Sequence, residues 1–75
     1  MEGLIKYTLN TTSCYTQNIY TLNDFSDYIN ETHGVSLENS MITYVDFEGD
    51  EICILDDRQF EIALVQFPEL LKLRI

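Results

Sequence analysis

Acidic side chains crowd one stretch of the sequence. Residues 46–61 hold seven of the thirteen Asp and Glu residues of the chain and a single base, Arg58. Neighbouring carboxylates can transfer protons, coordinate a cation or bind basic side chains of a protein. Like charges held close together repel one another, and a cation relieves that repulsion. We therefore interpret the stretch as a candidate binding site, with these acids: Asp46, Glu48, Asp50, Glu51, Asp56, Asp57 and Glu61.

These acids could also have a purely local role or bind a metal. Asp residues cap helices, and the helix dipole favours negative charge in a first turn, so the local role stays open. Calcium is disfavoured, because an EF-hand loop has Gly at its sixth position and Gly49 follows Asp46 by only three residues. Cys14, Cys53 and His33 also lack the spacing of a zinc site. We predict neither a metal nor a cofactor.

Length and charge restrict the classes of partner. Seventy-five residues make one small domain, residues 1–75, with a thin core. Thirteen acids against four bases give a net charge of −9, which argues against nucleic acid as a partner. An apolar fraction of 45% is ample for a packed fold. No apolar run reaches the ~18 residues of a membrane span, and the N-terminus does not resemble a secretory signal. We expect a cytoplasmic protein whose two cysteines are reduced thiols.

The elements that must position these acids follow from the apolar spacing. Residues 4–9 alternate as a strand with Lys6 turned away from the apolar face. The β-branched and aromatic stretch 15–22 predicts a second strand. Thr21 or Asn23 then caps a helix that Gly34 ends. Further elements are predicted in the second half: a strand over 41–47, a turn at 48–50, a strand around 52–54, a helix capped by Asp56 that ends before Pro68, and a strand over 71–75.

This order of elements predicts a fold class. Strand, strand, helix, strand, strand, helix, strand in so short a chain indicates an α+β protein with a mixed sheet of about five strands and two helices. The ubiquitin-like β-grasp has this ββαββαβ outline. In such an arrangement we expect the turn at Gly49 and the helix cap at Asp56 to bring these carboxylates together as a single docking patch for a cationic partner.

The acidic stretch resembles a known motif. Residues 44–57, continuing through Phe60 to Leu64, are similar to the acidic OPCA motif of the Phox-and-Bem-one (PB-one, or PB1) domain family. The shared pattern is an aromatic residue, an acid two positions on, an acid-Gly-Asp turn, alternating aliphatic residues, an acidic helix cap, and then a large apolar residue and Ala. The predicted β-grasp elements around the motif extend the resemblance to the whole chain.

The resemblance implies a function in protein interaction. PB1 domains associate front to back, and the acidic face of one packs against a basic face of the next, which is marked by a Lys on the first strand. The basic face here would be Lys6. By residue-wise transfer the acidic face would be formed by Asp46, Glu48, Asp50 and Asp57, with Asp56 and Glu61 as flanking charge.

Some positions depart from the family pattern. Phe47 and Gln59 stand where many members have acids, and residues 17–20 have no base where members with a strong basic face do. We therefore expect an acidic-type domain that binds the basic face of a separate PB1-type partner, for heterodimerisation in signalling or scaffold assembly. Head-to-tail self-assembly through Lys6, as in a selective-autophagy receptor or scaffold, is the alternative. A single solvated lysine without a partner also stays open for Lys6.

Two other functional classes are disfavoured. An enzyme needs a concave site, and His33 has no Ser or Cys nucleophile near it in the sequence. Ubiquitin-like modifiers end in a Gly-Gly tail, whereas residues 73–75 of this chain continue a predicted strand. We expect a binding module without catalytic activity.

Overall fold

The elements occur in the order that the sequence predicts. A computed structural model describes residues 3–75 of the chain. It contains β1 (Leu4–Leu9), β2 (Thr12–Thr16), α1 (Leu22–His33), β3 (Ile42–Val45), β4 (Glu51–Ile54), α2 (Asp57–Gln66) and β5 (Leu70–Arg74). None of the helices in this part of the chain is long and apolar enough to cross a bilayer.

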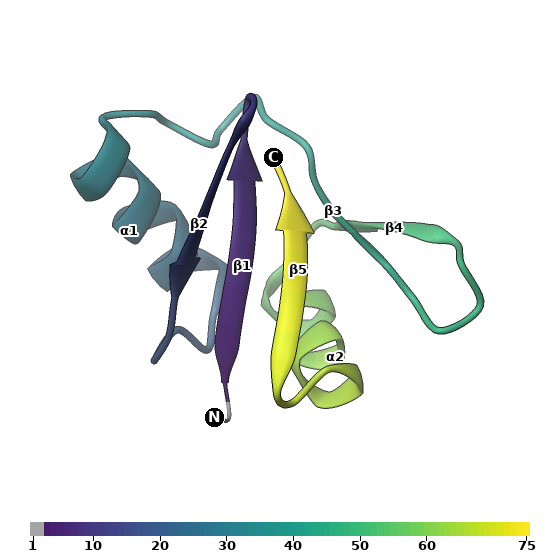
Figure 1. The fold of residues 1–75 in the computed structure, drawn as a ribbon. Coiled ribbons are helices and arrows are strands. Elements are labelled where there is room, and N and C mark those ends of the chain that lie inside the picture. The colour runs from purple at the N-terminus through teal and green to yellow at the C-terminus, as the bar shows by residue number, and fades with distance from the viewer. Residues whose placement is uncertain (1–2) are drawn as a thin grey trace.

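One mixed sheet joins all five strands. Its order is β2-β1-β5-β3-β4, with β1 and β5 parallel at the centre and the other neighbours antiparallel. Both helices lie behind the same face of the sheet in Figure 1. This is the predicted α+β, ubiquitin-like β-grasp. The last strand of the chain therefore lies between the first and the third.

The core lies between the sheet and the two helices. Alternate residues of the central strands point inward, which leaves the residues between them on the outer face. Phe25 and Ile29 of α1 pack on this inner face together with Phe60 and Ala63 of α2, and all four are fully buried. The inner face of β1 and β5 is formed by Ile5, Tyr7, Leu71 and Leu73.

The second strand differs from the prediction. The sequence predicts it over residues 15–22, but β2 ends at Thr16. Leu9 pairs with Thr12, so the connection is a two-residue turn in which Asn10 has a φ of 59°. Asn18 has a φ of 66°, a left-handed conformation that interrupts an extended strand. The β-branched residues beyond it form a loop because the backbone turns there.

The third strand is also shorter than predicted, whereas the helix caps are confirmed. β3 ends at Val45 instead of residue 47, because the backbone turns at Phe47 and Glu48, where the N–H of Gly49 donates to the carbonyl of Asp46. Thr21 caps α1 by accepting a hydrogen bond from the N–H of Asp24. The helix ends at Gly34, whose φ of 69° suits a residue without a side chain.

The two cysteines lie on opposite edges of the sheet. Cys14 is on β2 and Cys53 is on β4, and both are free, half-buried thiols. Four strand spacings of ~4.8 Å separate these edges. A disulfide requires Cα atoms within about 7 Å, so the two thiols cannot pair within one chain.

Candidate functional site

The turn between β3 and β4 is organised by Asp46. Its Oδ1 accepts hydrogen bonds from the backbone N–H of Glu48 at 3.0 Å and of Asp50 at 2.9 Å. The backbone N–H of Asp46 also donates to the carbonyl of Asp50 at 2.9 Å. Gly49 has a φ of 85° at the tip, where a side chain would be strained. We call residues 46–50 the acidic turn. Its backbone is held by the first of its own acids.

The other two acids of the acidic turn point into solvent. Glu48 and Asp50 are exposed, and only their backbone groups contribute to the hydrogen bonds of the turn. Their carboxylates are therefore carried by a fixed backbone without being part of its scaffold. Asp46 is half-buried, and its negative charge adds to burial, the larger cause, in raising the pKa of Tyr44. The three acids have different roles: one builds the turn and two are presented by it.

Asp56 and Asp57 lie at the N-terminus of α2, and we call them the helix-tip acids. Asp56 caps the helix by accepting from the N–H of Gln59 at 2.9 Å, and Gln59 Oε1 accepts from the N–H of Leu55 at 2.6 Å. The cap at Asp56 is as predicted, and with Gln59 it forms a variant of the capping box in which the residue before the cap is the donor. Asp57 accepts from the N–H of Leu22 at 2.9 Å, which ties the start of α1 to α2. Both acids are exposed while they stabilise helix starts.

The acids named from the sequence therefore fall into two groups. The acidic turn precedes β4 and the helix-tip acids follow it. Asp56 lies six positions after Asp50, and at ~3.3 Å for each step of extended chain the two groups are up to about 20 Å apart. Glu61 is exposed farther along α2, beside a shallow groove that Arg58 also borders. Within residues 3–75, no group of three or more His, Cys, Asp or Glu side chains lies close enough together to hold a metal ion.

The outer face of the sheet gathers three of the four bases of the chain. Lys6 of β1 pairs in register with Lys72 of β5, and Thr8 pairs with Arg74. Residues paired across neighbouring strands share a face and lie about 4.8 Å apart. Lys6 also lies over the ring of Tyr15, with 5.9 Å from Nζ to the ring centroid. We call Lys6, Lys72 and Arg74 the basic face.

The sequence pointed to Lys6 alone on this face. Lys72 and Arg74 alternate with buried Leu71 and Leu73, so their outward direction is visible in the sequence. Their proximity to Lys6 is not visible in the sequence, because Lys72 lies 66 positions after Lys6. This proximity could have been predicted from the β-grasp fold, in which the first and last strands pair in parallel. Residues 17–20 have no base, and Lys72 and Arg74 of the fifth strand add positive charge beside Lys6.

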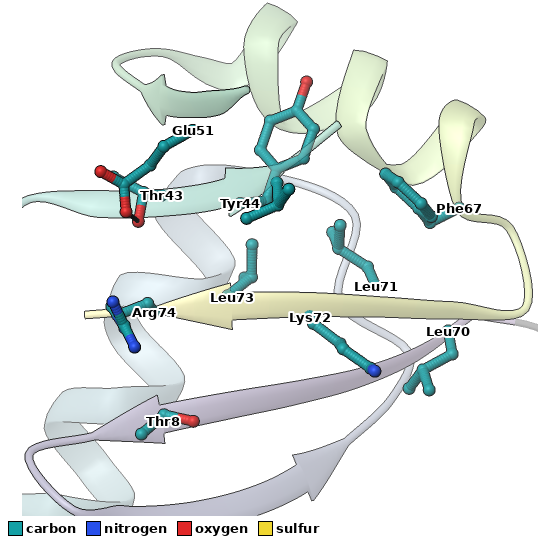
Figure 2. Close-up of a pocket in the computed structure, with 11 residues that line it drawn as sticks. Thr8, Thr43, Tyr44, Glu51, Phe67, Leu70, Leu71, Lys72, Leu73 and Arg74 are labelled. Carbon is teal, nitrogen blue, oxygen red and sulfur yellow. Dashed lines mark hydrogen bonds between the residues drawn. The ribbon is translucent and has the colours of Figure 1, made fainter. Parts of the chain in front are cut away.

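A pocket of about 550 Å³ opens where β3 and β5 diverge. The strands pair at Thr43 and Arg74, beyond which they separate. Figure 2 shows Leu71 and Leu73 pointing from β5 toward β3 and α2, whereas Lys72 points the other way. We call this space the gap pocket. It is lined by Thr8, Thr43, Tyr44, Val45, Glu51, Phe67, Leu70, Leu71, Lys72, Leu73 and Arg74.

His33 belongs to a contact between β1 and α1. Its Nε2 lies 2.8 Å from the hydroxyl oxygen of Tyr7, which also donates to the hydroxyl of Tyr28 at 3.3 Å. Burial, reinforced by the Tyr28 hydrogen bond, raises the pKa of Tyr7 above its usual value. The rings of His33 and Tyr28 pack edge to face on that of Tyr7, with centroids 5.6 Å and 5.9 Å from it. His33 therefore helps to anchor the end of α1 on the sheet.

Solved structures share this fold. No protein-family model and no curated protein matches the sequence. The AtNBR1-PB1 domain superposes with a TM-score of 0.78 at 15% identity, over 97% of this chain and 93% of that one. The AtNBR1-PB1 filament (L-type), solved by cryo-EM, gives 0.77 at 15% identity over 99% and 94%. The long form of the Cdc24p PB1 domain, a solution structure, gives 0.60 at 17% identity over 99% and 95%. The chain has the fold of a PB1 domain.

The PB1 fold accounts for the placement of both charged surfaces. Its β3–β4 hairpin presents the acidic turn, and its central parallel pair, β1 and β5, presents the basic face. The likeness extends over nearly the whole chain and is one of fold. The roles of individual acids and bases depend on the hydrogen bonds and strand register of this chain.

Proposed function

We propose that this chain is a protein-interaction domain of the acidic PB1 type, which binds a basic face of another PB1-type domain. The observation that carries the proposal is the acidic turn. Asp46 holds its backbone by two hydrogen bonds and leaves the carboxylates of Glu48 and Asp50 free in solvent. Charges on a rigid backbone lose little conformational entropy when they pair, so more of their attraction contributes to affinity.

The magnitudes favour a cluster over single ion pairs. One exposed Lys–carboxylate pair contributes roughly 0.2–1 kcal/mol, too little for a specific complex. Close charge pairs in desolvated interfaces reach couplings of about 1.5–7 kcal/mol. The helix-tip acids extend the charge beyond the turn, so a partner with several bases can contact both groups. We expect fast, strongly salt-dependent association, because charges are screened over about 8 Å at physiological ionic strength.

A second copy of this chain is the other candidate partner. The basic face favours it, because Lys6 and Lys72 lie side by side and repel one another unless carboxylates approach. The chain thus has a cationic surface on the sheet and an anionic one on the β3–β4 hairpin. Front-to-back contacts between different surfaces generate closed rings or open filaments, depending on whether the rotation between subunits closes. The AtNBR1-PB1 domain, which shares the fold, forms a filament.

Sedimentation velocity at rising protein concentration and at low and high salt tests both candidates. Self-association predicts growth at low salt that high salt reverses. Replacing Glu48→Lys and Asp50→Lys should abolish the growth, whereas Glu31→Lys with Glu38→Lys, exposed acids on other segments, makes the same change in net charge and should not.

A mixing experiment separates the two surfaces. Lys6→Glu with Lys72→Glu should also give monomers, yet this variant mixed with the Glu48→Lys, Asp50→Lys variant should form a one-to-one pair through the surfaces left intact. If the unmodified chain stays monomeric at low salt, self-assembly is wrong. If a basic PB1-type domain then binds the chain and its Glu48→Lys, Asp50→Lys variant equally well, the acidic surface is wrong as well.

A further inference from the structure

The gap pocket combines an apolar floor with a charged rim. Val45, Phe67 and Leu70 line it with accessible apolar surface, above the nearly buried side chains of Tyr44, Leu71 and Leu73. Lys72 and Arg74 of the basic face line its β5 side. A volume of about 550 Å³ falls within the range of roughly 300–1,000 Å³ that is usual for ligand pockets. The chemistry that fits is an apolar group with negative charge beside it.

The acidic turn presents such a group. Phe47 lies between Asp46 and Glu48, and its side chain is 75% exposed. One side of its ring packs against Phe67, with centroids 4.7 Å apart, which fixes its direction. A large aromatic side chain exposed to this extent loses the benefit of burial until something covers it. Phe47 does not line the gap pocket of its own chain, although Phe67, on which its ring packs, does.

We propose that the gap pocket receives the Phe47 ring of a second copy of this chain, with Glu48 of that copy beside Lys72 and Arg74. The inference rests on the proposed function and names the partner and a specificity residue for it. Complementarity supports it, because an aromatic side chain framed by acids meets an apolar floor bordered by bases.

The rim of the pocket has one acid, which sets the orientation of the partner. Glu51 lines the β3–β4 side and accepts a hydrogen bond from Thr43 at 3.4 Å. An incoming carboxylate is repelled by Glu51 and attracted by Lys72 and Arg74 on the opposite side. The acidic turn of the second copy should therefore approach over β5. The same arrangement disfavours a partner that brings acids to both sides.

The test uses two variants that associate in one direction only. The donor has Lys6→Glu with Lys72→Glu and keeps its acidic turn. The acceptor has Glu48→Lys with Asp50→Lys and keeps its basic face and gap pocket. Calorimetry of the pair gives the dissociation constant. Phe47→Ala in the donor should raise it by about tenfold or more, because burial of one phenyl ring is lost. Met41→Ala in the acceptor changes an exposed apolar side chain away from the pocket, should leave the constant unchanged and serves as the control for folding.

Met41→Ala in the donor is the matched control for an exposed apolar side chain. Met41 is 66% exposed and lies outside both the acidic turn and the pocket, so its removal should not alter the dissociation constant. The Phe47 contribution should also persist at high salt, whereas the contribution of Glu48 and Asp50 should shrink, because screening weakens charge pairs and not apolar burial.

A fluorescent probe reports burial directly. The chain has no Trp, so Phe47→Trp in the donor gives a single indole. Its emission should shift to shorter wavelength when acceptor saturates it, and Met41→Trp in the donor should show no shift. If Phe47→Ala in the donor leaves the dissociation constant unchanged, and the emission of the Phe47→Trp donor does not shift when acceptor is added, this inference is overturned. The proposed association is not affected by that outcome. A donor and acceptor that do not bind each other would overturn both the inference and self-association.

Discussion

The acidic turn and the basic face are built by opposite routes. The acidic turn is one uninterrupted segment, residues 46–50, whose backbone is held by hydrogen bonds among its own residues. The basic face joins Lys6 from the first strand to Lys72 and Arg74 from the last. Its geometry depends on the parallel pairing of β1 and β5 and on the core beneath them. One surface is local and the other exists only in the folded sheet.

This difference determines what each surface tolerates. A local turn keeps its shape when distant packing changes, whereas a surface assembled across strands is lost when one strand shifts. A slip of one residue between β1 and β5 would turn Lys72 or Lys6 inward, because side chains alternate between faces. Leu71 and Leu73 prevent the slip, since both are buried on the inner face. Stability and the basic face are therefore coupled, while the acidic turn is more independent.

The largest expected difference is between the inner and outer faces of β5, and truncating a core residue of this strand should lower the stability of the fold most. Leu71 is 1% exposed, and Leu71→Ala should lower the free energy of unfolding by about 2–5 kcal/mol through lost burial and a cavity. Lys72→Ala, at the neighbouring exposed position, should change it by less than about 0.5 kcal/mol. Urea denaturation measures both. Equal effects of the two substitutions would mean that β5 does not hold its place through its inner face.

Reversing one charge of the basic face should weaken association without unfolding the domain. In the Glu48→Lys, Asp50→Lys acceptor, Lys72→Glu should raise the dissociation constant for the donor about tenfold or more. Arg58→Glu makes the same charge change on α2, away from the sheet face, and should have little effect. Calorimetry at low salt measures both. If Arg58→Glu weakens the pair as much, net charge and not the basic face drives association.

Within the acidic turn, Asp46 and Asp50 should prove unequal. Asp46→Ala leaves two backbone N–H groups without their acceptor and should cost about 1–3 kcal/mol of stability. Asp46→Asn keeps a side-chain oxygen and should cost less. Asp50→Ala should leave stability nearly unchanged and weaken partner binding. Thermal denaturation together with a binding titration separates the two roles, and identical profiles for Asp46→Ala and Asp50→Ala would contradict the assigned roles.

Substitutions on the two faces of β1 should also have different effects, and the change in stability should be smaller than those above. Tyr7→Phe removes the hydroxyl that contacts His33 and Tyr28 and should reduce stability by about 0.5–1.5 kcal/mol. The neighbouring substitution Lys6→Ala should act on association and leave stability nearly unchanged. Denaturation curves and sedimentation of the two variants test this division. A Tyr7→Phe variant as stable as the parent would show that the hydroxyl contacts contribute nothing net.

Most of the fold was predictable because local signals agree with the tertiary structure. Apolar alternation identified β1 and β5, and the caps at Thr21, Gly34 and Asp56 placed both helices. The prediction of β2 was wrong in extent, because its β-branched and aromatic residues continue past Asn18, where the backbone turns with a positive φ. Strand propensity does not predict a turn with a positive φ when the residue at that position is not Gly.

The sequence by itself determined the order of the elements, the turn at 48–50 and the inward or outward direction of the residues of β1 and β5, because these depend on neighbours along the chain. Only the tertiary structure decided that Lys72 and Arg74 join Lys6, that Asp46 builds the turn as well as adding charge to it, and that a pocket opens between β3 and β5. These features depend on which distant strands pair and where they part. That choice is made by burial of the whole core, which no single stretch of sequence contains.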